Sequence, residues 1–126
     1  MQLSAPSAFR IAALLGFLGV ALGAFGAHGL EPTLKARGMV DVWNKAVLYH
    51  FLHTVVMLGL AASLRPFPAG VFLCFLAGVL GFSGSLYAYA LAGTRFLVFI
   101  TPLGGLCFLA GWLWLIIAAR RYFALE

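Results

Sequence analysis

The chain has 126 residues, of which 64% are hydrophobic and only 9% are charged, and its mean hydropathy is +1.08. Soluble domains carry roughly a quarter charged residues, so this composition excludes a soluble protein and indicates an integral membrane protein. The net charge of +5 would suggest nucleic acid as a partner of a soluble protein. Here no nucleic-acid binding is expected, because most basic residues flank apolar runs, where they hold helix ends at the lipid headgroups.

Four apolar runs are long enough to cross a bilayer as helices. The first, Ile11 to Ala27, is expected to be a retained helix rather than a cleaved signal peptide, since its glycines are spaced for helix packing. The others are Val42 to Leu64, Ala69 to Ala92 and Phe96 to Ala119. We therefore predict an all-α fold, with residues 1–126 forming a single four-helix transmembrane domain.

The connections predict how the helices are ordered. Residues 65–68 and 93–95 are too short to join anything but antiparallel neighbours. The longer connection, His28 to Asp41, is expected to hold a short interfacial helix, with Pro32 at its first position, Gly38 at its end and Asp41 capping the next helix. Basic residues are equally numerous on the two sides, and the terminal amine with the acids of the long loop favours both termini in the cytoplasm.

Small residues recur at helical spacing in two of the predicted helices. Such stripes allow two helix backbones to approach closely, and we interpret them as packing contacts inside the bundle rather than as a dimer seam. The stripe of the first helix is Gly16, Gly19, Gly23 and Gly26, and that of the third is Ala77, Gly81 and Ser85.

Polar residues gather in one half of the predicted bundle, beneath the long connection. Polar groups are costly in a bilayer, so this layer is the candidate functional site. Within the second helix, Trp43, His50 and His53 share one face with Met57. The members of the predicted polar layer are His28, Trp43, Tyr49, His50, His53, Ser83, Ser85, Tyr87 and Thr101.

The histidines leave two interpretations open. A neutral imidazole can bind a metal or haem or relay a proton, so His28, His50 and His53 are weak metal candidates. Alternatively, each histidine only hydrogen-bonds a polar group on a neighbouring helix. No carboxylate lies within the spans, which favours the second interpretation. No cofactor is clearly implied.

No catalytic motif is recognisable, which favours a protein without enzymatic activity. The segment Gly81 to Ser85 has no acid partner and no strand-to-helix turn, so it is not a nucleophile elbow. Pro102 removes one backbone hydrogen bond from the fourth helix, and a kink facing the polar layer is expected there.

The same segments resemble a known family. The residues that carry the resemblance are Gly23 to Leu30, Trp43 with Tyr49, His50 and His53, Phe82 to Tyr87, Ile100 to Gly105, and Gly111 with Trp112. Together they are similar to the domain of unknown function 423 family, whose eukaryotic relatives are the transmembrane protein 256 proteins. The resemblance implies a bacterial inner-membrane protein of four helices and supplies no catalytic residues.

Three functional hypotheses follow. The preferred one is a non-enzymatic binding module whose polar layer accepts a small ligand, ion or proton. The second is an accessory subunit that packs against partner helices of a larger membrane complex, or against another copy of itself. The third is a metal- or haem-binding membrane enzyme or carrier.

Overall fold

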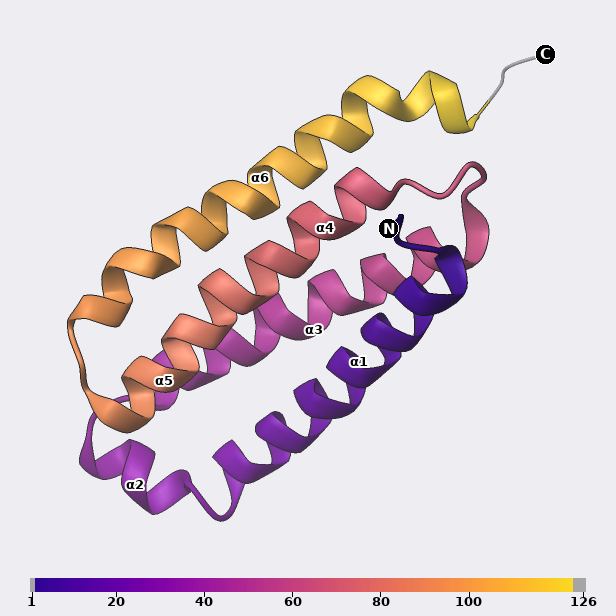
Figure 1. The fold of residues 1–126 in the computed structure, drawn as a ribbon. Helices are drawn as coiled ribbons and strands as arrows, with labels where there is room; N and C mark the ends of the chain where they lie inside the picture. Colours follow the sequence, from indigo (N-terminus) through magenta and orange to yellow (C-terminus); the bar gives the residue numbers. More distant parts are fainter. Residues whose placement is uncertain (1, 124–126) are drawn as a thin grey trace.

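The protein is a bundle of antiparallel helices, seen here in a computed structural model that describes residues 2–123 (Figure 1). Four helical segments in this range are long and apolar enough to cross a membrane. They are α1 (Ala5–Ala27), α3 (Val40–Ser63), the segment Ala69–Ala92 and α6 (Phe96–Tyr122). The predicted all-α fold with four spans is confirmed. α1 begins and α6 ends at the end of the bundle that holds the α3–α4 connection.

The first helix is longer than its uncharged run. α1 begins at Ala5, because the Ser4 hydroxyl accepts a hydrogen bond from the Ser7 amide at 3.4 Å and Pro6 suits the first turn. Arg10 therefore lies within the helix rather than before it. Ala8 is fully buried, so these added turns belong to the packed part of the bundle.

The predicted interfacial helix is present as α2 (Glu31–Ala36). Gly38 follows it with a positive φ of 65°, the left-handed conformation that glycine adopts after helices. Lys35 Nζ lies 2.6 Å from a Glu31 carboxylate oxygen, and its hydrogen bond lowers the pKa of that exposed carboxyl. Asp41 does not cap α3 as predicted, because the helix already begins at Val40 and Asp41 lies in its first turn.

The third span has the predicted ends but not a uniform helix. It consists of α4 (Ala69–Gly78), a π-helical turn η1 (Val79–Ser83) and α5 (Gly84–Ala92). A π-turn places an extra residue in one turn and occurs often at functional sites. The fourth span, α6, continues without interruption through Pro102.

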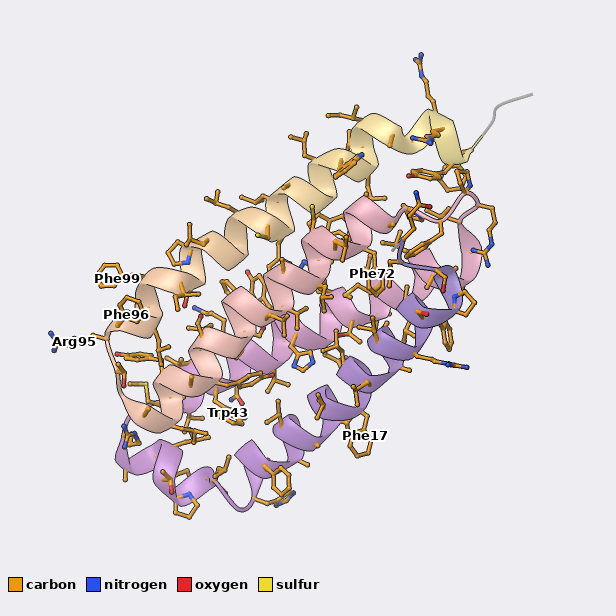
Figure 2. The ribbon with its side chains drawn as sticks, viewed as in Figure 1. Phe17, Trp43, Phe72, Arg95, Phe96 and Phe99 are labelled. Carbon is orange, nitrogen blue, oxygen red and sulfur yellow. The ribbon has the colours of Figure 1, made fainter. Side chains whose placement is uncertain are left out.

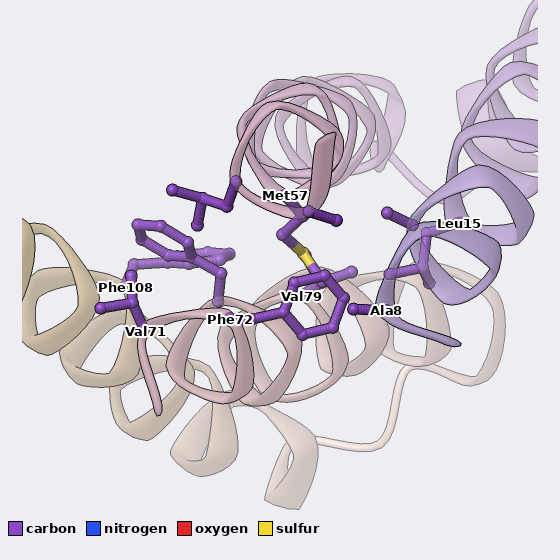
Figure 3. Packing of buried hydrophobic residues seen from close by; sticks show 11 residues of the cluster. Ala8, Leu15, Met57, Val71, Phe72, Val79 and Phe108 are labelled. Carbon is purple, nitrogen blue, oxygen red and sulfur yellow. The ribbon is translucent and has the colours of Figure 1, made fainter. Parts of the chain in front are cut away.

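The four spans form a rhombus in cross-section. Figure 3 shows α3, marked by Met57, facing α4, marked by Phe72, with α1 and α6 at opposite sides. The main core lies between all four spans. A smaller core of Leu34, Trp43 and Ala90 joins α2, α3 and α5 beneath the long connection. Between the two cores lie most of the buried polar side chains.

The glycine stripe of α1 faces α3 along its whole length. A Cβ at Gly16 would meet Thr54, one at Gly19 would meet Phe51 and His50, and one at Gly23 would meet Val47. A Cβ at Gly26 would overlap the indole of Trp43. α1 and α3 can lie this close only because the stripe has no side chains.

The stripe of the third span is composed differently from the prediction. Gly81 approaches the backbone of Gly104 on α6, whereas Ala77 is exposed and was wrongly assigned to a helix contact. Its place is taken by Gly78, where a Cβ would overlap the Phe108 ring. The reason is geometric: the π-turn at Val79–Ser83 adds a residue to one turn, so steps of four residues no longer identify one face across this span.

Replacing both Gly19 and Gly23 by leucine should lower the free energy of unfolding by at least about 2 kcal/mol, because overpacking costs about 1–3 kcal/mol a site. A Cβ at Gly19 would already lie 3.1 Å from Phe51 Cδ2, and one at Gly23 would lie 3.4 Å from Val47 Cγ1. Thermal unfolding in mild detergent measures the effect. Gly59→Leu is the matched control, since a Cβ there meets nothing within 4 Å. An unchanged melting temperature of the double variant would contradict the packing of α1 on α3.

Candidate functional site

Two side chains of α3 reach across to the backbone of α1. Trp43 Nε1–H donates to the Leu22 carbonyl at 2.9 Å, and His50 Nε2 lies 2.8 Å from the Leu15 carbonyl oxygen. The two donors are seven residues apart on α3, and their two acceptors are seven residues apart in the reverse direction on α1, as an antiparallel pair requires. Gly26 and Gly19 leave the space through which these rings approach. These two hydrogen bonds fix the register between α1 and α3.

The contacts of His50 determine its tautomer. Because the Leu15 carbonyl can only accept, Nε2 of a neutral His50 must carry the proton. The other ring nitrogen, Nδ1, lies 2.9 Å from the Tyr87 hydroxyl oxygen and therefore accepts a hydrogen bond from that hydroxyl. A single buried imidazole thus connects α1, α3 and α5, and both of its nitrogens are occupied.

His53 adopts the tautomer opposite to that of His50, and it bonds α6 rather than α1 and α5. Its Nδ1–H donates to the Tyr49 carbonyl one turn earlier at 2.8 Å, and its Nε2 accepts from Trp112 Nε1–H of α6 at 3.1 Å. The imidazole also stacks on Phe108, with ring centroids 3.7 Å apart and an interplanar angle of 12°. Together, Trp112 and Phe108 attach α6 to α3 through side chains.

The hydroxyl groups of the third span complete the connections between helices. Ser83 Oγ donates to the Ala46 carbonyl of α3 at 2.7 Å. Ser85 Oγ donates to the Phe82 carbonyl at 2.9 Å and lies 2.6 Å from Thr101 Oγ1 of α6. Within residues 2–123, every buried side-chain nitrogen or oxygen has a hydrogen-bond partner. The polar residues therefore form separate links between helices rather than one continuous layer.

The predicted site residues do not all meet. Trp43, His50, His53, Ser83 and Ser85 are buried, and for the three residues of α3 their shared helix face predicted it. His28 is exposed at the end of α1 and contacts neither of the other histidines, while Tyr49 is 40% exposed. In the part of the chain that the structure describes, no three His, Cys, Asp or Glu residues are grouped so that they could hold a metal ion.

Sequence reasoning missed three residues of α6 that shape the site. Trp112 and Phe108 were not assigned to the polar layer because tryptophan and phenylalanine are ordinary in an apolar run. Gly104 is the closest approach of the bundle, since a Cβ there would overlap the Phe82 backbone nitrogen. The seven-residue spacing from Gly104 to Gly111 is the signal that identifies this face, because a Cβ at Gly111 would lie 2.6 Å from the Phe75 ring.

An aromatic groove of about 460 Å³ lies between α3 and α6. Phe82 of the π-turn, Phe108 and His53 form its inner surface, and its outer residues are exposed, so it opens towards the lipid. The Tyr49 hydroxyl makes no hydrogen bond with another residue of the range 2–123, and it is a free polar group of the groove. The residues that line the aromatic groove are Tyr49, Leu52, His53, Phe82, Pro102, Gly105, Leu106, Phe108, Leu109 and Trp112.

The fold and the site define a small four-span membrane protein whose helices are joined by buried hydrogen bonds and which carries a lateral aromatic groove. The chain belongs to the family described as "Protein of unknown function (DUF423)", whose model matches residues 22–105. This segment contains both buried histidines, the π-turn and Gly104. The resemblance to that family is confirmed.

The relatives are also membrane proteins. A UPF0382 membrane protein of Staphylococcus haemolyticus is 46% identical over 89% of this chain and 93% of its own length. The UPF0382 inner membrane protein YgdD of Escherichia coli is 44% identical over 87% of this chain and 86% of its own. No solved structure matches the chain. The four spans and these relatives place the protein in the bacterial cytoplasmic (inner) membrane.

Proposed function

We propose that the protein is a non-enzymatic membrane module that binds the apolar chain of a membrane amphiphile in the aromatic groove. The observation that carries the proposal is the groove itself: a space of about 460 Å³ open to the bilayer and lined by rings from three of the spans. In lipid, an acyl chain gains little from leaving other chains, so binding must depend on close packing against a fitting surface.

The groove is suited to this role because its walls are held in place before any ligand enters. The hydrogen bond from Trp112 to His53 and the stacking of His53 on Phe108 fix three of its rings. Phe82 is held by contacts with the Tyr49 and Phe108 rings, with centroids 4.6 and 5.7 Å away. A preformed site loses little conformational entropy on binding.

The two other hypotheses gain no support from the glycine stripes or from the buried histidines. The glycine stripe of α1 and the glycines Gly78, Gly81 and Gly104 face helices of the same chain, so they do not call for partner helices. Both ring nitrogens of His50 and of His53 are engaged by protein groups, so neither offers a lone pair to a metal or haem without breaking a helix-to-helix bond.

Photolabelling tests the proposal. A phospholipid with a diazirine on its acyl chain should label the segment from Pro102 to Trp112 in the parent protein, and Gly105→Leu should reduce this labelling several-fold. A Cβ at Gly105 makes only an ordinary contact, 3.7 Å from Phe82 Cδ2, so the added leucine fills the groove without displacing α6.

Two further variants keep this test decisive. Gly59→Leu places the same side chain on an open face of α3 and should leave the labelling unchanged. Leu106→Trp fills the groove from an exposed position and should reduce labelling even if Gly105→Leu folds poorly. Equal labelling of the parent and both groove-filling variants would overturn the proposed function.

A further inference from the structure

A second hollow lies beside the α5–α6 connection. This crevice of about 430 Å³ is lined by Tyr89, Arg95, Val98 and Phe99. Arg95 follows the short turn at Gly93, so it lies at the membrane surface on the side of α2. Figure 2 shows Arg95 and Phe99 projecting from the bundle at this point.

The crevice and the aromatic groove lie on the same face of α6. Arg95, at the N-cap of α6, and Val98 and Phe99 in its first turn each precede a groove residue by seven positions, namely Pro102, Gly105 and Leu106. On the facing span, Tyr89 of the crevice follows Phe82 of the groove in the direction of the α5–α6 connection. Seven residues make nearly two full helical turns, or about 10 Å, so the crevice lies directly above the groove along one track.

Within residues 2–123, the charge of the crevice has no partner. The Arg95 side chain makes no ion pair and no hydrogen bond with any residue of the range 2–123, and the Tyr89 hydroxyl makes none either. Of the acids described on this side, Glu31 is held by Lys35 and Asp41 lies on α3. A guanidinium with free donors favours a phosphate group, and a tyrosine hydroxyl can donate to the same oxygens.

Resting on the proposed function, we infer that the amphiphile is an anionic phospholipid of the leaflet on the side of α2. Its phosphate binds Arg95 and Tyr89 in the crevice, and its chain follows α6 into the aromatic groove. Trp112 lies 17 positions after Arg95, which is about 25 Å of helix, so the track reaches past the middle of a hydrocarbon core of about 30 Å. One lipid chain can therefore lie along the whole groove.

The inference is tested by a competition between phosphatidylglycerol and phosphatidylcholine with identical chains. Native mass spectrometry of the parent protein in mild detergent measures which of the two lipids stays bound. The parent should retain phosphatidylglycerol preferentially, and Arg95→Gln should reduce this preference about fivefold, which is the effect of one basic side chain on anionic lipid. Tyr89→Phe should produce a smaller loss. Free glycerophosphoglycerol, the headgroup without chains, should not compete.

Lys45→Gln is the matched control, because it removes one charge on the same side of the membrane from the exposed face of α3. An equal effect of Lys45→Gln and Arg95→Gln would overturn the inference in favour of general surface charge, and so would a parent that retains both lipids equally. If photolabelling still depends on Gly105 in those cases, the proposed function stands without the headgroup site. If it does not, the proposed function itself fails.

Discussion

Gly104→Ala is expected to lower the free energy of unfolding by about 2–3 kcal/mol, although alanine normally stabilises a helix by about 1 kcal/mol relative to glycine. A Cβ at Gly104 would overlap the Phe82 backbone nitrogen and approach Gly81. A backbone atom cannot turn away as the end of a flexible side chain can, so α6 must move outwards as a whole. The movement also stretches the 2.6 Å contact between Ser85 and Thr101.

Gly105→Ala provides the matched control for this prediction. It adds the same methyl group one residue later, where the nearest heavy atom is Phe82 Cδ2 at 3.7 Å. The control should unfold at the parent's temperature or slightly above it. Unfolding of all three proteins in mixed detergent micelles measures the difference, and equal stabilities would show that α6 does not depend on the glycine-to-glycine approach.

His50→Leu is expected to cost about 2–4 kcal/mol of unfolding free energy. The change removes the hydrogen bond to the Leu15 carbonyl and leaves the half-buried Tyr87 hydroxyl without a partner. Tyr87→Phe should cost less, because it leaves only one imidazole nitrogen unpaired. His28→Leu should have little effect, since that histidine is exposed.

The double variant His50→Leu/Tyr87→Phe separates the hydrogen bond from packing. Removing both partners leaves neither unpaired, so the double variant should be more stable than the sum of the two single losses predicts, by about 1 kcal/mol. Unfolding in mixed micelles gives the four stabilities of this cycle. Strict additivity would mean that His50 and Tyr87 act independently, against their 2.9 Å contact.

The polar contacts of α3 show how far the sequence leads. The spacing of Trp43, His50 and His53 predicted one buried face, and all three are buried. That spacing could not reveal that His50 bonds α1 and Tyr87 while His53 bonds Trp112 on α6, because each partner is set by the rotation of a different neighbouring helix. The residues of the predicted polar layer therefore form separate links between helices.

The sequence by itself determined the four spans, their antiparallel order, the interfacial helix and the face of α1 that packs against α3. Hydropathy, loop length and glycine spacing are properties of neighbouring residues, so they can be read along the chain. Only the tertiary structure decided the π-turn at Val79–Ser83, the approach of Gly81 to Gly104 and the aromatic groove. The glycine approach and the groove arise where segments far apart in sequence meet, and their geometry depends on how closely the backbones can pack. The π-turn contains Gly81 and Phe82, which take part in both.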